Sequence, residues 1–234
     1  MRRVVLAGAT GLVGGHLLDG LLADDTVAEV HVVGRRPVSV AHAKLRMHVV
    51  DLRAIPPLPP VDEVYLALGT TIKVAGSREA FRAIDYDANL AVARAAYKAG
   101  ARRIGLVSAM GANAKSSVFY NRVKGELEDA VLRFETTATV VIRPSLLLGD
   151  RQLLGQPARR GEILAAPIMS FLRVILPRNY WAISAEKVAR ALLTEVPSAK
   201  GARVITVFSA KLYGARSHPN RKSAQLALTQ LCSS

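Results

Sequence analysis

The chain has 234 residues and carries 32 Lys and Arg against 18 Asp and Glu, a formal net charge of +14. Apolar residues make up 50% of it, enough for a sizeable core and too many for a disordered chain. No apolar run approaches the roughly 18 residues of a membrane span. The single cysteine, Cys232, excludes an intramolecular disulfide and favours a cytoplasmic location. The excess positive charge suits nucleic acid, an anionic surface or a phosphorylated ligand.

Strand and helix patterns alternate through the first 145 residues. Short apolar runs predict strands over 3–9, 27–33, 47–52, 63–68, 103–108 and 139–142. Helical spacing predicts helices over 12–22, 78–99 and 120–134, and four prolines over 55–60 predict a loop. Continuous apolar strands separated by helices are typical of a parallel sheet covered on both faces. We therefore predict an α/β fold, a Rossmann doubly wound parallel sheet.

The pattern changes after Pro144. Residues 149–183 predict a short substrate region, which includes Arg151, Arg159 and Arg160. Ser184 is a candidate N-cap for a helix over 186–196, and a last strand is expected over 204–208. From residue 210 onward there are four basic residues and no acidic one, which predicts a weakly packed tail, disordered or a short helix. We expect one domain over 1–209 and a basic tail over 210–234.

A glycine-rich turn lies between the first predicted strand and the first predicted helix. Its spacing is G-x-x-G-x-x-G over 8–14. Glycines let a pyrophosphate approach the helix N-terminus, where free N–H groups attract its charge. The alternative is a turn that serves packing alone. The candidate dinucleotide contacts in this turn are Gly8, Thr10, Gly11, Leu12, Val13 and Gly14.

Two arginines, Arg35 and Arg36, follow the second predicted strand. An NAD site usually has an acidic residue here for the ribose 2′-hydroxyl, whereas a guanidinium suits a 2′-phosphate. We therefore expect NADP rather than NAD, although a solvated pair of arginines would look the same. Asp51, followed by Leu52, would accept from the adenine amino group or be a solvated acid at a strand end.

Tyr120 and Lys124 are spaced i and i+4 on a predicted helix and so share one face. A tyrosine beside an ammonium can exchange a proton with a substrate oxygen, and the lysine can bind ribose hydroxyls. Ser108 ends a predicted strand where parallel sheets bind ligands, so its hydroxyl would orient a substrate carbonyl or satisfy a turn. Ser116 and Ser117 compete for this role from a loop. Asn89 would hold a water or a backbone carbonyl behind the lysine, or lie on a helix surface.

In this order, these residues resemble the short-chain dehydrogenase/reductase superfamily over about residues 3–208. The run from Ser108 to Glu128 looks most like the Tat-interacting-protein-type oxidoreductases and their small bacterial relatives. The resemblance implies that Gly69 lies under the adenosine ribose and that Pro144 borders the nicotinamide. It assigns Tyr120 as acid/base, Lys124 as ribose ligand and Ser108 as the group that steadies the oxygen. The family's common Ser-Ser is Ser108-Ala109 here, so one hydroxyl is missing.

Three classes of function are open at this point. The first is an NADP(H)-dependent oxidoreductase acting on a small carbonyl or alcohol, with epimerase or dehydratase chemistry as a variant. The second is a regulatory protein that senses NADP(H) without turnover. In either case we expect a monomer or a homodimer. Nucleic-acid binding is disfavoured, because the basic residues are scattered and aromatic residues are only 5% of the chain. The five histidines show no metal-ligand spacing, so we expect no metal. Because no apolar run is long enough to span a bilayer, we expect no membrane partner.

Overall fold

The computed structural model describes residues 1–145, 147–148, 183–207 and 212–217. Its main sheet has eight strands in the order β10-β9-β6-β5-β4-β1-β2-β3. Neighbouring strands are parallel except β10, which runs antiparallel to β9 at one edge. These strands are β1 (Arg2–Ala7), β2 (Val27–Gly34), β3 (Leu45–Val49), β4 (Glu63–Leu66), β5 (Arg103–Val107), β6 (Ala138–Pro144), β9 (Gly201–Val207) and β10 (Leu212–Ser217).

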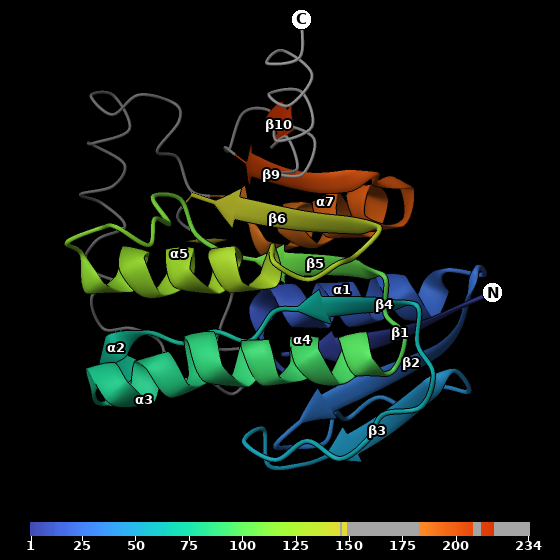
Figure 1. Cartoon of the computed structure of the whole chain (residues 1–234). Helices are drawn as coiled ribbons and strands as arrows, with labels where there is room; N and C mark the ends of the chain where they lie inside the picture. The colour runs from blue at the N-terminus through green and yellow to red at the C-terminus, as the bar shows by residue number, and fades with distance from the viewer. Residues whose placement is uncertain (146, 149–182, 208–211, 218–234) are drawn as a thin grey trace, which may run out of the picture.

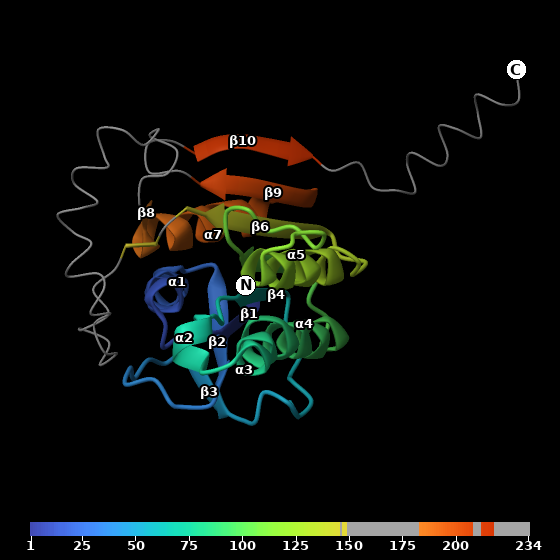
Figure 2. The same ribbon diagram turned by 90° about the vertical axis from the view of Figure 1, so that its left-hand side faces the viewer.

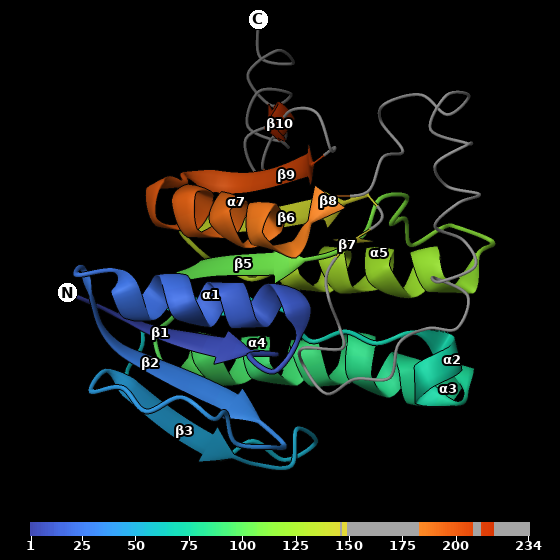
Figure 3. The same cartoon turned by 180° about the vertical axis from the view of Figure 1, so that it is seen from behind.

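Helices cover both faces of this sheet. Figure 1 shows α4 (Asn89–Lys98) and α5 (Phe119–Val131) in front of the sheet, and Figure 3, the view from behind, shows α1 (Leu12–Ala23) and α7 (Ala185–Ser198) on its opposite face. Each face has its own core of buried side chains, one between α1, α7 and the sheet and the other between α4, α5 and the sheet. The predicted doubly wound Rossmann sheet is therefore confirmed.

The predicted helix over 78–99 is three consecutive pieces. They are α3 (Arg78–Arg82), the π-helical turn η1 (Ala83–Ala88) and α4. A π-turn adds one residue to a helical turn and so rotates the side chains that follow it. A further four-residue helix, α2 (Ile72–Ala75), precedes them and was not predicted. Thr71 caps it by accepting a hydrogen bond from the backbone N–H of Val74 at 3.3 Å.

The chain after β6 continues the same layers where it is described. The short strands β7 (Leu147–Leu148) and β8 (Ile183–Ser184) pair in parallel, and α7 follows directly. Ser184 caps α7, as expected, by accepting from the N–H of Lys187 at 3.4 Å. Residues 212–217 form β10, where the sequence favoured a weakly packed tail; an antiparallel edge strand needs pairing on one side only, so its sequence signal is weak. The predicted substrate region over 149–183 lies almost wholly outside the described residues.

Figure 2 looks onto the edge of the sheet at which the parallel strands end. In open parallel sheets, ligands bind at this edge where the strand order reverses. Here the order reverses between β1 and β4, because β2 and β3 lie on one side of β1 and β4, β5 and β6 lie on the other. The turn after β1 and the loop after β4 therefore meet at the expected ligand position.

Candidate active site

A cavity of about 250 Å³ opens at the carboxyl ends of β1, β4, β5 and β6. It is lined by the start of α1, the loop after β4, the ends of β5 and β6, and one face of α5. Eight residues that the sequence predicted for the site line it together: Gly11, Leu12, Val13, Gly69, Ser108, Tyr120, Lys124 and Pro144. The structure thus gathers the glycine turn and the Tyr-x-x-x-Lys pair into one space.

At two positions of the glycine turn, neighbouring backbone atoms lie too close for any residue with a side chain. Gly8 has φ +92°, and a Cβ there would lie 2.4 Å from the carbonyl oxygen of Ala67 on the loop after β4. A Cβ on Gly14 would lie 1.9 Å from the carbonyl oxygen of Gly8, so α1 and β1 approach too closely for any side chain. Gly11 precedes α1 without a side-chain cap, which leaves the first N–H groups of the helix free to bind an anion.

Tyr120 lies in the first turn of α5, one turn before Lys124, and both line the cavity. The ring of Tyr120 packs against the ring of Phe81, which is fully buried, at 5.4 Å between centroids. This contact ties the start of α5 to α3 and holds the phenol at the cavity wall. The predicted pairing of Tyr120 and Lys124 on one face agrees with this geometry.

Lys124 forms an ion pair that the sequence did not reveal. Its Nζ lies 2.7 Å from Oδ1 of Asp85, and both side chains are buried. The other oxygen of Asp85 accepts the backbone N–H of Thr70 at 2.8 Å. Burial acts to lower the pKa of Lys124, but the charge of Asp85 and the nearby Tyr120 outweigh it, so that the pKa lies above its ordinary value. Asp85 also lines the cavity and is therefore part of the site.

Asn89 is buried behind this ion pair rather than on a helix surface. Its amide donates to the carbonyl oxygens of Leu68 at 3.1 Å, Ile84 at 3.3 Å and Asp85 at 3.1 Å. These bonds join the irregular turn η1 to the loop after β4. The predicted contact of Asn89 with a backbone carbonyl is therefore present.

The hydroxyl of Ser108 is engaged by another buried group. It donates to Glu128, one turn after Lys124 on α5, and Glu128 also binds Arg143 of β6 in a bidentate ion pair. Both Ser108 and Glu128 are buried, with 5% and 2% of their surface exposed. Ala109, which follows, lines the cavity without a hydroxyl. The predicted serine is therefore at the cavity, but its hydroxyl bonds to the protein.

The residues expected to bind the adenosine end lie outside the cavity lining. Arg35 and Arg36 are exposed after β2. Asp51 is exposed and pairs with Arg53 at 2.8 Å, and the hydrogen bonds from Arg53 lower the pKa of Asp51 to about 2. Leu52 is buried in the core on the α4 side. Their assignment to adenosine stays a prediction.

A parallel sheet that carries a glycine-rich turn before α1 and a Tyr-Lys pair at the same edge is typical of dinucleotide-binding Rossmann proteins. The family model described as NAD(P)H-binding matches residues 8–148. The chain belongs to this NAD(P)H-binding family.

Curated relatives carry a name that states a location. The Aspergillus terreus "Protein fmp52-1, mitochondrial" is 36% identical over 82% of this chain and 85% of its own length. Relatives from Emericella nidulans and Aspergillus fumigatus are also named fmp52, mitochondrial. The prediction of a cytoplasmic location is therefore wrong. The single cysteine indicates a reducing compartment, but it does not specify which compartment that is. None of these relatives bears the Tat-interacting-protein name.

Solved structures with the same fold are remote in sequence. A UDP-N-acetylglucosamine 4-epimerase from Methanobrevibacter ruminantium is 18% identical with a TM-score of 0.65, over 91% of this chain and 78% of its own. "MoeE5 in complex with UDP-glucose and NAD" is 19% identical with a TM-score of 0.64, over 97% and 82%. A short chain dehydrogenase family protein from Francisella tularensis is 13% identical with a TM-score of 0.61, over 88% and 97%. They support the fold alone.

Within the described ranges, no three His, Cys, Asp or Glu side chains are grouped so that they could hold a metal ion. In that same part of the chain, no helix is both long and apolar enough to cross a membrane.

Proposed function

We propose that this protein is an NADP(H)-dependent oxidoreductase acting on a small carbonyl or alcohol compound. The observation that carries the proposal is the cavity at which Tyr120 and Lys124 lie together with the uncapped start of α1. The backbone N–H groups of Leu12 and Val13 would bind the pyrophosphate, and Lys124 would donate to the ribose hydroxyls. The glycine turn fits this group at Gly11, which lines the cavity without a side chain directly before the uncapped start of α1.

The proposed chemistry divides between cofactor and protein. A bound nicotinamide supplies or accepts the hydride at the substrate carbon. In reduction, the phenol O–H of Tyr120 gives its proton to the carbonyl oxygen, and the proton is replaced from solvent. The Ser108 hydroxyl bonds to Glu128, so we assign Ser108 to fixing the end of β5 rather than to holding the substrate.

Turnover of a carbonyl panel with NADPH tests the assignment of Tyr120. We expect Tyr120→Phe to lower kcat by about 10²–10⁴-fold with little change in NADPH affinity, because only the proton donor is lost. Tyr97→Phe, on α4 away from the cavity, is the matched control and should retain full activity. Activity of Tyr120→Phe within a few-fold of the wild type contradicts the mechanism.

The preference for NADP rests on Arg35 and Arg36, which are exposed at the carboxyl end of β2. Replacing both by Ala should weaken NADPH binding at least tenfold and leave NADH binding nearly unchanged, since only a 2′-phosphate needs the guanidinium groups. The control is Arg46→Ala, which removes an arginine of β3 that pairs with Glu29 of β2. Titration of dinucleotide fluorescence measures each affinity, and an equal loss for both dinucleotides contradicts the assignment.

A regulatory NADP(H) sensor is the second candidate. It is favoured by the occupied hydroxyl of Ser108 and by Ala109, which together leave the cavity short of the usual second hydroxyl. A sensor would bind NADPH tightly without turnover on any panel, and its capture of a partner would differ between NADPH and NADP. Partner capture that is independent of the dinucleotide would count against this candidate.

A further inference from the structure

We propose that Asp85 is the positioning residue that holds Lys124 as a charged ammonium against the dinucleotide site. The inference deepens the proposed function and rests on it for the consequence on dinucleotide binding. The state of Lys124 can be measured in the free protein, independently of any dinucleotide.

The first support is the burial of the pair. The Lys124 side chain is 6% exposed and that of Asp85 is 0% exposed, with 2.7 Å between Nζ and Oδ1. An ammonium removed from water without a counter-charge is strongly disfavoured, and the group releases its proton instead. Lys124 therefore needs a partner at this position in order to remain charged.

The second support is the way in which Asp85 is held. Its Oδ2 accepts the N–H of Thr70 at 2.8 Å, and its carbonyl oxygen accepts from the Asn89 amide at 3.1 Å. Asp85 lies within the π-turn η1, an irregular segment of the kind that often marks functional sites. The carboxylate is thus fixed at both its side chain and its backbone, and it fixes Nζ in turn.

The third support is the set of charges that face Lys124. From η1 comes Asp85, and from α5 itself come Tyr120 and Glu128. Glu128 is already bound by Arg143 and Ser108, so its charge is largely compensated. Burial lowers the pKa of Lys124, and Asp85 is the foremost group that raises it. Without Asp85, burial would prevail.

This arrangement predicts how binding varies with pH. A charged ammonium donates stronger hydrogen bonds to ribose hydroxyls than a neutral amine. Because the folded pKa of Lys124 is raised, the wild type keeps the ammonium through the neutral and mildly alkaline range. In Asp85→Asn the pKa falls, so the ammonium and its contribution to dinucleotide affinity are lost as the pH rises through the lowered pKa.

NMR titration of the Lys124 side chain in the full chain tests the proposal, with the signal assigned by its loss in Lys124→Gln. We expect Lys124 to stay charged from about pH 6 to about pH 9 in the wild type, and Asp85→Asn to lower its pKa by about two units or more. Asp87→Asn removes an exposed acid from the same turn and should leave the titration unchanged. Asp85→Glu should restore most of the charge at neutral pH.

A wild-type titration of Lys124 in Asp85→Asn overturns the proposal. Should that variant fail to fold, the carboxyl carbon of Asp85 is followed in the wild type, where an ionised carboxylate at neutral pH supports the proposal and a protonated one overturns it. Dinucleotide affinity against pH is measured in parallel. Absence of dinucleotide binding by the wild type would refute the proposed function, while the NMR titrations would still decide the role of Asp85.

Discussion

At the scale of single residues, the sequence predicted the Tyr120–Lys124 pair but not the buried acids beside it, Asp85 and Glu128. Lys124 and Glu128 are four residues apart on α5, and Asp85 and Asn89 are four apart on the facing segment. The sequence alone does not distinguish a charged helix residue that is exposed to solvent from one that is paired in the core, because the pairing depends on the facing helix. The usable signal was the spacing itself, which places Asp85 and Asn89 on the face that also carries the buried Phe81.

The glycine turn yields a prediction that separates packing from backbone freedom. In Gly14→Ala the new Cβ would lie 1.9 Å from the carbonyl oxygen of Gly8, so β1 and α1 must separate. We expect a loss of roughly 1–3 kcal/mol in the free energy of unfolding and loss of dinucleotide binding. Urea denaturation and fluorescence titration measure the two effects.

The adjacent glycine provides the matched control. A Cβ on Gly15 would lie 3.8 Å from the carbonyl oxygen of Ala9, an ordinary contact, and Gly15 has helical neighbours. Gly15→Ala should therefore stabilise the protein by about 0.5–1 kcal/mol and retain binding. Equal behaviour of the two variants would refute the role assigned to Gly14.

At the scale of elements, periodicity located every parallel strand of the sheet but not the break within the helix over 78–99. Apolar residues continue to recur at helical spacing across η1, so the sequence pattern does not reveal the inserted residue. The predicted third strand over 47–52 is β3 over Leu45–Val49, shifted because its edge position leaves it partly exposed and weakens the apolar pattern. Irregular turns and edge strands are where tertiary contacts decide the structure.

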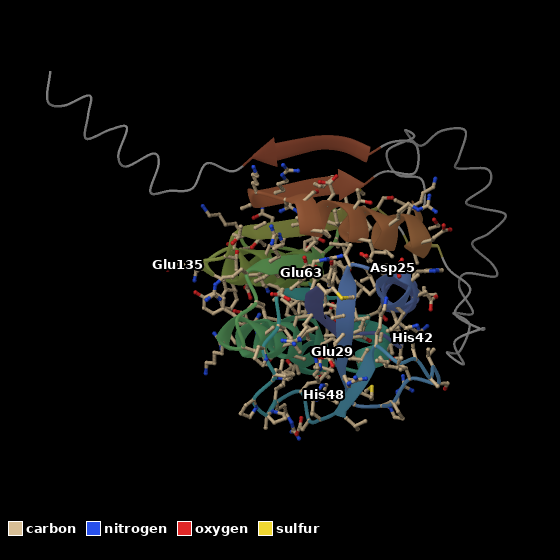
Figure 4. All side chains as sticks on the ribbon, turned by 90° about the vertical axis from the view of Figure 1, so that its right-hand side faces the viewer. Asp25, Glu29, His42, His48, Glu63 and Glu135 are labelled. Atoms are coloured by element: carbon tan, nitrogen blue, oxygen red, sulfur yellow. The ribbon has the colours of Figure 1, made fainter. Side chains whose placement is uncertain are left out.

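The pairing of β2 with β3 includes two histidines in direct contact. Nδ1 of His31 lies 3.0 Å from Nε2 of His48, and Nε2 of His31 lies 3.5 Å from Glu29. Figure 4 labels Glu29 and His48 on these neighbouring strands. Arg46 also pairs with Glu29, so the cluster is rich in positive charge. Burial, and then His48, lower the pKa of His31, with Glu29 opposing them.

This cluster predicts an acid sensitivity of the sheet edge. A histidine whose folded pKa is lowered favours the folded state above its unfolded pKa of about 6.5, and this contribution is lost as the pH falls through that range. We expect the free energy of unfolding to decrease from about pH 7.5 to about pH 5. Urea denaturation at several pH values measures it.

Two variants locate the effect. His31→Gln keeps a group that can bond to His48 but cannot take up the proton, so its stability should depend less on pH over this range. His16→Gln, on the exposed side of α1, should retain the wild-type dependence. A pH dependence that is unchanged in His31→Gln would show that another group is responsible.

At the scale of the whole molecule, the fold class follows from the sequence because alternation of strand and helix permits few topologies. The location does not, since cysteine usage separates oxidising from reducing compartments only. The charge of +14 is likewise ambiguous. Some of the 32 basic residues pair with buried acids, as Lys124 does with Asp85 and Arg143 with Glu128, whereas others, such as Arg94 and Lys98 on α4, are exposed.

The excess charge predicts how stability varies with salt. Like charges repel in the compact state, and salt shortens the range of that repulsion from about 30 Å at 0.01 M to about 8 Å at 0.15 M. We expect the free energy of unfolding to rise with NaCl over this range.

Arg94→Glu with Lys98→Glu lowers the net charge from +14 to +10, because each substitution changes it by two. This variant should be more stable than the wild type at low salt, by roughly 0.5 kcal/mol, and less dependent on salt. Arg94→Lys with Lys98→Arg keeps the charge and should match the wild type in urea denaturation. A free energy of unfolding that falls with NaCl in the wild type would mean that local ion pairs, rather than net repulsion, dominate the electrostatics of this fold.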